Sequence, residues 1–299
     1  MTKISYSTSV PCRLVRINAQ GSHPRHGLLF EPEGSANKKT VVVHSHGTLG
    51  NFFFNDFLDK FAEIYTKNKI SFLTFNHLAH DGLAESVVDG VVEYVGGSLS
   101  EFGTCITDFL LVEDMLDRMG FETIVFQGHS LGCERVVHYS EKSNSRMPKI
   151  LLAPVNSRST QIAWCKERLG VPYPDFLETL ENSAGNTIRN DIYGSPSEDP
   201  EWDYSIPVTE RALYSLLSSD AISYFDSKTS QLERFENTLV VLPSQDAFSE
   251  FSNTDLIEFF SSRLTGESES YVANCDHDFK NCLQDVCKKC VTWIESLKC

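Results

Sequence analysis

The sequence predicts an α/β fold in which a mainly parallel sheet is flanked by helices and interrupted by one helical insertion. Short β-branched runs alternate with amphipathic segments along most of the 299 residues. Because one parallel strand can follow another only after a crossover, this alternation favours a parallel sheet with helices on its faces. The alternation stops between residues 155 and 236, and this gap predicts the insertion.

The strands are predicted from short apolar runs that end near glycine or proline. Residues 10–17 and 26–31 alternate loosely around Gly21, Pro24 and Gly27, which is typical of a hairpin. The later runs are rich in valine, isoleucine and leucine, as buried strands are. They cover residues 40–46, 70–75, 123–127, 149–153, 239–242 and 268–272.

Helices are predicted where apolar residues recur every three to four positions. In residues 99–118, for example, Phe102, Ile106 and Phe109 share one face, and Gly120 follows the end of the pattern. The predicted helices cover residues 55–67, 99–118, 131–141, 253–264 and 279–297.

Residues 155–236 contain aromatic and helical pieces but no clear buried strand, and they include the turn-rich segment 194–200. We interpret them as a helical cap over the C-terminal edge of the sheet. Residues 1–154 and 237–299 would then form the core. The alternative is two ordinary crossover helices joined by long loops.

Charge and composition exclude several classes of partner. The formal net charge of −15 and the pI near 5.0 disfavour binding to nucleic acid or to anionic membrane surfaces. The N-terminus lacks the apolar core of a secretory signal, and no window has the roughly 18 apolar residues needed to cross a bilayer. We therefore expect a soluble cytoplasmic protein whose nine cysteines are reduced thiols.

A candidate nucleophile lies between the predicted strand 123–127 and the following helix. Residues 128–132 read Gly-His-Ser-Leu-Gly, which matches the pattern Gly-x-Ser-x-Gly. A serine at such a sharp strand-to-helix turn projects above the sheet, and the flanking glycines let the strand and the helix approach closely. Ser130 is therefore the predicted nucleophile. The alternative is a serine in an ordinary glycine-rich turn.

The serine hydroxyl needs a general base within hydrogen-bond reach. After Ser130 the chain has two histidines, His138 and His277. His138 lies about two turns along the same helix and cannot fold back onto the hydroxyl. His277 lies in a loop after a predicted strand, at the edge of the sheet where Ser130 also lies, and is the predicted base.

The acid that orients this histidine is expected at the same edge. Asp246 lies in the loop that follows strand 239–242. We predict that it holds the imidazole in the correct tautomer and stabilises the imidazolium. Its rivals, Asp220 and Asp226, fall in the presumed cap, and the two aspartates beside His277 are too close in sequence to meet its ring easily.

Two backbone N–H groups are predicted to bind the developing oxyanion. One belongs to Leu131, at the N-terminus of the helix after Ser130. The other belongs to the loop 46–51, which reads His-Gly-Thr-Leu-Gly-Asn and can turn tightly at its glycines. We expect Thr48 to supply this second donor, with Leu49 as the alternative.

Taken together, the His46-Gly47 loop and the loops that hold Ser130, Asp246 and His277 resemble the α/β-hydrolase superfamily over nearly the whole chain. The resemblance implies the α/β-hydrolase fold. Residues 128–133, together with the segment Glu93-Tyr94-Val95-Gly96-Gly97, are similar to a family of small esterase-like hydrolases. Some relatives of that family cleave esters or thioesters of secondary metabolites. The superfamily also includes proteins without hydrolytic activity.

These residues predict hydrolysis of a carboxylic ester or thioester through an acyl-enzyme at Ser130. The chemistry requires no metal and no other cofactor. The expected partner is a small acyl substrate, either free, carrier-bound or part of a secondary metabolite. Acyl transfer or cyclisation by the same residues is the first alternative, and a non-catalytic ligand receptor on the same fold is the second.

Three other groups of residues each allow two interpretations. Phe52-Phe53-Phe54 fits an acyl pocket or the core. His77, His80 and Asp81 carry side chains that bind metals, although a hydrogen-bonding role is favoured. The segment 287–290 has the spacing Cys-x-x-Cys of a metal or redox site. Its cysteines fall on the apolar face of the last predicted helix, so we expect buried thiols.

Overall fold

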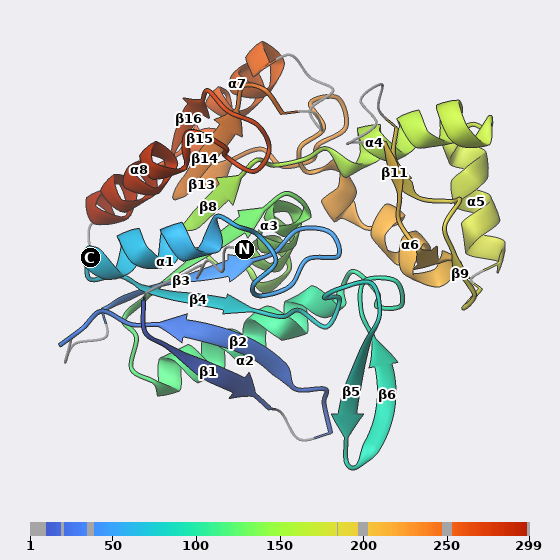
Figure 1. Cartoon of the computed structure of the whole chain (residues 1–299). Helices are drawn as coiled ribbons and strands as arrows, with labels where there is room; N and C mark the ends of the chain where they lie inside the picture. The colour runs from blue at the N-terminus through green and yellow to red at the C-terminus, as the bar shows by residue number, and fades with distance from the viewer. Residues whose placement is uncertain are drawn as a thin grey trace, which may run out of the picture.

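The computed structural model describes residues 10–18, 21–34, 39–183, 185–196, 203–246 and 253–297. Its centre is an eight-stranded sheet with the strand order β1-β2-β4-β3-β7-β8-β14-β16 (Figure 1). β2 pairs with β1 and with β4 in antiparallel fashion, and the pairs from β4 to β16 are parallel. The predicted α/β class with a mainly parallel sheet is confirmed.

The inner strands of the sheet, β3, β4, β7, β8 and β14, are almost entirely buried. Helices cover both faces of the sheet, and for this reason the inner strands appear in the sequence as unbroken apolar runs. The strands are β1 (Cys12–Ile17), β2 (Arg25–Phe30), β3 (Thr40–Ser45), β4 (Ser71–Phe75), β7 (Thr123–His129), β8 (Lys149–Leu152), β14 (Thr238–Pro243) and β16 (Glu269–Ala273).

The helices form one layer on each face of the sheet. α1 (Leu58–Lys67) and α8 (Leu283–Ser296) lie together on one face (Figure 1). α2 (Thr104–Arg118), α3 (Leu131–Ser143) and α7 (Asn253–Ser261) pack on the other face. Successive side chains of the inner strands therefore enter two different cores. Within the described residues, none of the helices has the length and apolar character needed to reach across a bilayer.

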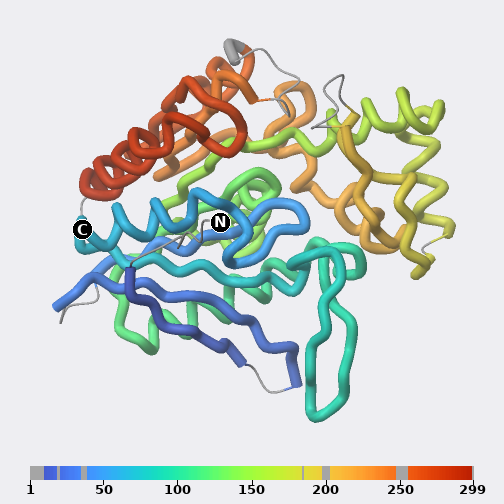
Figure 2. Tube along the Cα trace, viewed as in Figure 1, coloured from blue at the N-terminus to red at the C-terminus, as the bar shows by residue number. Residues whose placement is uncertain are grey.

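One hairpin was missed in the sequence. β5 (Ala84–Val88) and β6 (Val91–Val95) form a separate two-stranded ribbon that extends away from the sheet (Figures 1 and 2). Their turn is Asp89-Gly90, where both residues have positive φ angles of 49° and 83°. An Asp-Gly pair between apolar runs is a strong hairpin signal. The Asp89-Gly90 pair therefore marks this ribbon in the sequence.

The segment between β8 and β14 contains helices that gather at one end of the sheet (Figure 1). They are α4 (Ser157–Trp164), a π-helical turn (Cys165–Leu169), α5 (Tyr173–Ser183), α6 (Glu210–Leu217) and a 3₁₀ helix (Asp220–Ser223). Two short strand pairs that were not expected accompany them: β9 (Ile188–Arg189) with β12 (Val208–Thr209), and β10 (Gly194–Ser195) with β11 (Tyr204–Ser205). A third short pair joins β13 (Phe235–Glu236), at the end of the segment, to β15 (Leu264–Thr265), which follows α7. The division of the chain into a core and a cap at residues 155 and 236 stays a prediction.

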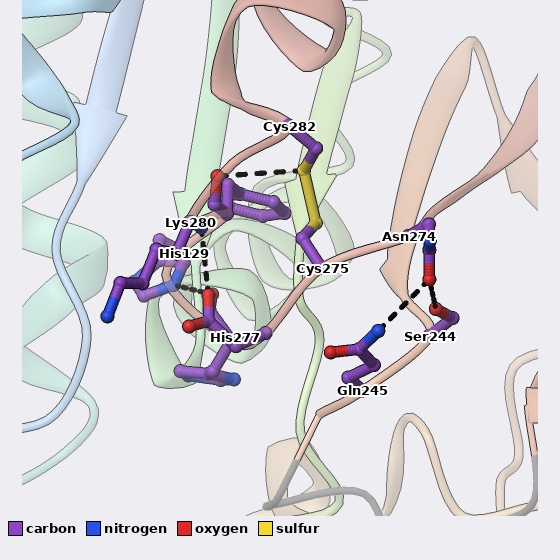
Figure 3. Close-up of a disulfide and its surroundings, with 10 residues drawn as sticks. His129, Ser244, Gln245, Asn274, Cys275, His277, Lys280 and Cys282 are labelled. Atoms are coloured by element: carbon purple, nitrogen blue, oxygen red, sulfur yellow. Dashed lines mark hydrogen bonds between the residues drawn. A yellow bond between two sulfur atoms is a disulfide. The ribbon is translucent and has the colours of Figure 1, made fainter.

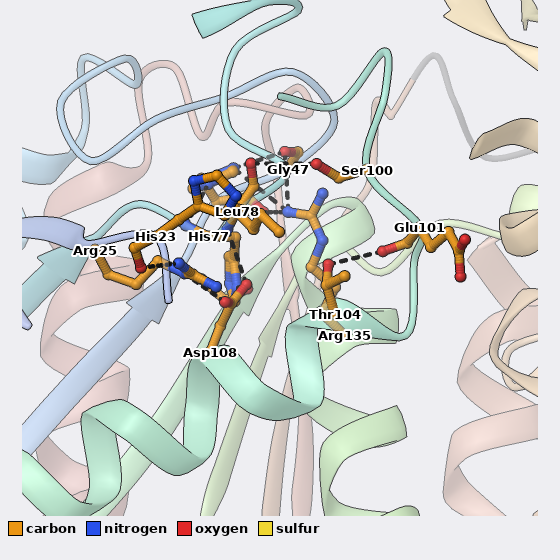
Figure 4. A network of polar contacts seen from close by, with 12 residues as sticks. His23, Arg25, Gly47, His77, Leu78, Ser100, Glu101, Thr104, Asp108 and Arg135 are labelled. Carbon is orange, nitrogen blue, oxygen red and sulfur yellow. Dashed lines mark hydrogen bonds and ion pairs between the residues drawn. The ribbon is translucent and has the colours of Figure 1, made fainter. Parts of the chain in front are cut away.

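A buried ion pair joins β2 to α2. Arg25 Nε donates to Asp108 Oδ1 at 2.6 Å, and the two side chains are 3% and 0% exposed. The other carboxylate oxygen accepts from Leu78 N–H at 2.9 Å and lies 3.1 Å from His77 Nδ1 (Figure 4). Burial alone would raise the pKa of Asp108, but the hydrogen bond from His77, the charge of Arg25 and the Leu78 N–H lower this pKa below its ordinary value. The ionised carboxylate thus connects β2, α2 and the loop after β4.

Replacing this carboxylate should destabilise the fold strongly. Asp108→Ala leaves the Arg25 guanidinium buried without its partner, which costs about 3–5 kcal/mol of unfolding free energy. Urea unfolding followed by circular dichroism measures the loss. Asp108 has a lowered pKa in the folded protein, so its contribution is complete above the ordinary carboxyl pKa and is lost as the pH falls. The difference between wild type and variant should therefore shrink in acid.

The matched control is Asp114→Ala on the same helix. Asp114 pairs with Arg118 at 2.9 Å, but both side chains are exposed, so the expected change is below about 1 kcal/mol. Equal effects of the two substitutions would contradict the importance assigned to the buried pair.

Candidate active site

Ser130 lies at the sharp turn between β7 and α3. Its backbone has φ 56° and ψ −128°, a conformation that residues with a side chain rarely adopt. Two glycines make the turn possible by allowing backbone to meet backbone. A Cβ on Gly128 would lie 2.4 Å from Gly132 O, and a Cβ on Gly132 would lie 2.2 Å from Ser45 O. The strand–serine–helix arrangement expected from the sequence is present.

His277 and Asp246 meet at the same edge of the sheet. The imidazole Nδ1 lies 3.0 and 2.9 Å from the two carboxylate oxygens, and the side chains of His277 and Asp246 are 6% and 4% exposed. Because a carboxylate only accepts, we assign the hydrogen to Nδ1, which leaves Nε2 as the basic nitrogen. Ser130 and His277 line one cavity. The structure thus brings the three residues selected from the sequence to one place.

The loops that carry the acid and the histidine are bonded to each other (Figure 3). The N–H groups of Ser244 and Gln245 donate to Ala273 O at 2.7 Å and to Cys275 O at 2.9 Å. Both side chains also donate to Asn274 Oδ1, each at 3.1 Å. These bonds continue the pairing of β14 with β16 beyond the ends of the strands. They fix the spacing of the two loops.

His129, directly before the nucleophile, supports the histidine loop. Its Nε2 donates to the backbone oxygen of His277 at 3.0 Å (Figure 3). Burial lowers the pKa of His129 well below its ordinary value, so the ring is neutral and carries a single N–H. This role of His129 was not predicted from the sequence, in which its place beside Ser130 was the only signal.

Cys275 and Cys282 form a disulfide that closes the loop around His277 (Figure 3). The expectation that all cysteines are reduced thiols is wrong for this pair. Their Cα atoms lie 6.0 Å apart, and only the turn between them creates this proximity, so spacing alone could not reveal it. Cys287 and Cys290 are buried free thiols, as expected for the apolar face of the last helix.

The loop after β3 brings Thr48 beside the nucleophile. A Cβ on Gly47 would lie 3.0 Å from Ser130 Cβ, so a side chain at this position would crowd the nucleophile. Arg135 of α3 holds the loop: its Nη1 donates to His46 O at 2.8 Å and to Gly47 O at 3.4 Å (Figure 4). The peptide that carries Gly47 O also carries the Thr48 N–H on its opposite side. Arg135 therefore fixes the direction of the predicted donor.

Leu131 is the other predicted donor of the oxyanion site. It is the first residue of α3, directly after Ser130. The N–H groups in the first turn of a helix have no carbonyl partner within the helix, and the helix dipole favours negative charge there. Thr48 and Leu131 therefore flank the nucleophile from two sides.

A cavity of about 170 Å³ opens beside Ser130. The segment between β8 and β14 forms its other wall, through residues that the sequence did not single out. They are Val155, Ser157, Thr160, Tyr193, Ser195, Tyr204 and Ile206. Phe54 also lines the cavity and is 65% exposed, so it belongs to the pocket and not to the core. The walls combine hydroxyl groups with apolar surface, which suits a small organic ligand.

The other candidate acids do not bind the His277 ring. Asp220 pairs with Lys142 at 2.9 Å on the surface, and Asp226 accepts hydrogen bonds from its own loop. Asp278 lines the cavity, and burial raises its pKa. Its carboxylate lies 3.9 Å from His129. Of these aspartates, only Asp246 has a carboxylate within hydrogen-bond distance of the His277 ring.

The histidines after β4 take part in hydrogen bonds. Both ring nitrogens of His77 are engaged, Nδ1 with Asp108 at 3.1 Å and Nε2 with Ser45 Oγ at 2.8 Å. His80 Nδ1 lies 2.7 Å from Asp81 Oδ2. In the part of the chain that the structure describes, no three or more His, Cys, Asp or Glu side chains are grouped to hold a metal ion.

Reduction of the Cys275–Cys282 disulfide should destabilise the protein. The bond closes a loop with a sequence separation of 7, for which chain-entropy arithmetic gives about 2.5 kcal/mol. Urea unfolding with and without dithiothreitol measures the difference. The double variant Cys275→Ser/Cys282→Ser should be insensitive to the reductant. Two alkylatable thiols at these positions in unreduced protein would contradict the assignment.

Several solved structures are similar to nearly the whole chain. Est1E from Butyrivibrio proteoclasticus with bound ferulic acid is 14% identical with a TM-score of 0.62, and the match covers 94% of this chain and 98% of that one. The siderophore hydrolase EstB from Aspergillus fumigatus is 16% identical with a TM-score of 0.64, covering 97% and 99%. A thermostable carboxyl esterase from Bacillus coagulans is 10% identical with a TM-score of 0.61, also covering 97% and 99%.

The comparisons of sequence alone give no match: no protein-family model fits the chain, and no curated protein is similar enough to match it. At identities this low, the likeness to solved structures concerns the fold. The strand order and the two helical layers agree with it, and the chain has the α/β-hydrolase fold.

Proposed function

We propose that this protein is a serine hydrolase that cleaves a carboxylic ester or a thioester through an acyl-enzyme intermediate. The observation that carries the proposal is the contact of Asp246 with His277 in a cavity that also contains Ser130 at its strained turn. This combination of a nucleophile, a base and an orienting acid is the arrangement that activates a serine hydroxyl at neutral pH.

In the proposed reaction, Ser130 Oγ attacks the acyl carbonyl carbon while His277 Nε2 takes the hydroxyl proton. Asp246 holds the Nδ1–H and stabilises the imidazolium. The N–H groups of Thr48 and Leu131 bind the oxyanion of the tetrahedral intermediate. His277 then returns the proton to the departing alcohol or thiol. A water molecule, deprotonated by His277, then attacks the acyl carbon. The bond to Ser130 Oγ breaks, His277 returns the proton to this oxygen, and the acid is released.

The fold neighbours support ester chemistry at a coarse level. Their names describe Est1E with bound ferulic acid, a siderophore hydrolase and a carboxyl esterase. Together with the mixed polar and apolar walls of the cavity, they favour a small acyl substrate, either free, carrier-bound or part of a secondary metabolite. The reaction as derived requires no metal ion and no organic cofactor.

Two alternatives use the same site. If a hydroxyl or amine replaces water, the same residues perform acyl transfer or cyclisation. A ligand receptor on this fold would bind an ester with negligible turnover. Incubation of the purified protein with esters, thioesters and lactones separates these cases, because hydrolysis releases the free acid, transfer forms a new ester or amide, and a receptor leaves the compound intact.

Ser130→Ala should abolish covalent labelling by a fluorophosphonate and lower ester turnover by about 10³-fold or more, since the nucleophile and its base act as one unit. Mass spectrometry of the intact labelled protein measures the first effect, and steady-state kinetics measures the second. Ser140→Ala, further along the same helix, is the control and should label normally. Wild-type labelling of Ser130→Ala would exclude this residue as the nucleophile.

Asp246→Asn should preserve the fold but lower kcat by about 10³–10⁴-fold, because an amide favours the wrong tautomer of His277. The control is Asp220→Asn, which removes an exposed carboxylate that pairs with Lys142 and should leave kcat nearly unchanged. Near-normal turnover by Asp246→Asn would show that another group orients the histidine.

A further inference from the structure

A second, inner cavity of about 50 Å³ lies behind the loop after β3. Thr48, Tyr193 and Ile206 line both this cavity and the one that contains Ser130, so the two are neighbours. Most of the inner wall is apolar, and includes Leu49, Phe102, Leu131, Val208, Leu213 and Leu216.

One wall of the inner cavity carries a cation. Arg135 lines it and is 4% exposed. The Nη1 group of Arg135 donates to the backbone oxygens of His46 and Gly47. A guanidinium has five N–H donors, and those on Nε and Nη2 form no hydrogen bond or ion pair with any residue of the described ranges. Figure 4 shows Arg135 extending past Gly47 toward Ser100, which also lines this cavity.

Asp108 and Glu134 act on the charge of Arg135 from nearby, but among the described residues neither carboxyl group forms an ion pair with it. Asp108 lines the same cavity, but Arg25, His77 and Leu78 N–H occupy its oxygens. Glu134 is hydrogen-bonded to Ser157, and burial raises the pKa of Glu134 to about 8, so this side chain is mostly uncharged at neutral pH. A buried cation without an ion-pair partner is costly. An anion that enters the inner cavity would form this ion pair.

We propose that the inner cavity is an acyl subsite for chains that end in a carboxylate, and that Arg135 binds this carboxylate. This inference rests on the proposed ester-hydrolase function. The preferred substrates are then half-esters or half-thioesters of short dicarboxylic acids. Their hydrolysis consumes one water and releases the dicarboxylic acid and an alcohol or thiol.

The position of the cavity agrees with such a chain. The acyl carbonyl oxygen binds at the N–H groups of Thr48 and Leu131, and both of these residues also line the inner cavity. A chain attached to this carbonyl passes between Thr48 and Tyr193 to reach Arg135. The surface of the protein is acidic, with a net charge of −15, so selection for an anion depends on this local cation and not on long-range attraction.

The test compares kcat/KM for monoethyl glutarate, ethyl hexanoate and ethyl acetate. The first two differ mainly in charge at the far end of the acyl chain. Wild type should prefer the glutarate ester over the hexanoate ester by about 10-fold or more. Arg135→Met should lower this ratio by about 10²-fold, and Arg135→Lys should keep part of the preference. The ratio is the readout because Arg135 also holds the oxyanion loop, and that role affects all three esters alike.

Two further variants complete the design. Arg118→Met removes an exposed arginine of α2 and should leave the ratio unchanged, which controls for net charge. Ala212→Leu narrows the inner cavity without touching Arg135 and should lower kcat/KM for the glutarate ester more than for the acetate ester. The wild-type comparison and Ala212→Leu remain decisive if Arg135→Met does not fold.

The outcomes separate this inference from the proposed function. Hydrolysis of ethyl acetate without any preference for the glutarate ester would overturn the anionic subsite while leaving the serine hydrolase in place. Equal losses for all three esters in Arg135→Met would show that Arg135 acts only through the oxyanion loop, and would overturn it too. Absence of both ester turnover and Ser130 labelling in wild type would refute the proposed function itself.

Discussion

The close packing of the first turn of α3 against the end of β3 is the constraint on which the site depends. A Cβ at Gly132 would lie 2.2 Å from Ser45 O, and a Cβ at Gly47 would lie 3.0 Å from Ser130 Cβ. At Gly132 backbone meets backbone, and at Gly47 the backbone lies against the Ser130 side chain and His129 O. These two contacts couple the height of the serine above the sheet to the position of the loop that carries Thr48, so the nucleophile and the proposed oxyanion donors cannot move independently.

The acid and the base are placed by a different part of the same sheet. β14 and β16 are neighbouring parallel strands, so the loops after them leave the sheet at the same edge, and hydrogen bonds between the loops continue the pairing. His129 links this pair of loops to the nucleophile turn through the backbone oxygen of His277. The three loops come from distant parts of the sequence and form one connected unit.

This topology explains what the sequence could predict. Ser130, Asp246 and His277 each follow a recognisable strand, and parallel strands bring such positions to one edge whatever the details of packing. The fold class and these three positions were therefore accessible from pattern alone. The β5–β6 ribbon was also accessible, because its Asp89-Gly90 turn is a pair of residues that favours a hairpin.

Other features depend on contacts between residues whose proximity cannot be inferred from the pattern of the sequence. The Cys275–Cys282 bond requires the turn between the two cysteines, and the cavity walls come from a segment whose short strands consist of two residues each. Arg135 is a similar case. The sequence places the charged residues Glu134 and Arg135 next to each other on a helix that is buried over most of its length. Such a pair is unusual in a buried helix, but the partners of these two side chains could be identified only in three dimensions.

The two buried arginines near the site show how the same side chain can serve stability or function. Arg25 has a carboxylate at 2.6 Å, and the pair is complete within the protein, so it contributes to the folded state and leaves nothing to bind a ligand. Among the described residues, Arg135 is bound by the backbone oxygens of His46 and Gly47 and by His46 Nδ1, and these groups orient it without supplying a negative charge. Burying such a charge weakens the fold. Its position against both the oxyanion loop and the inner cavity is a reason for retaining it, because each of the two proposed roles needs a cation at this place.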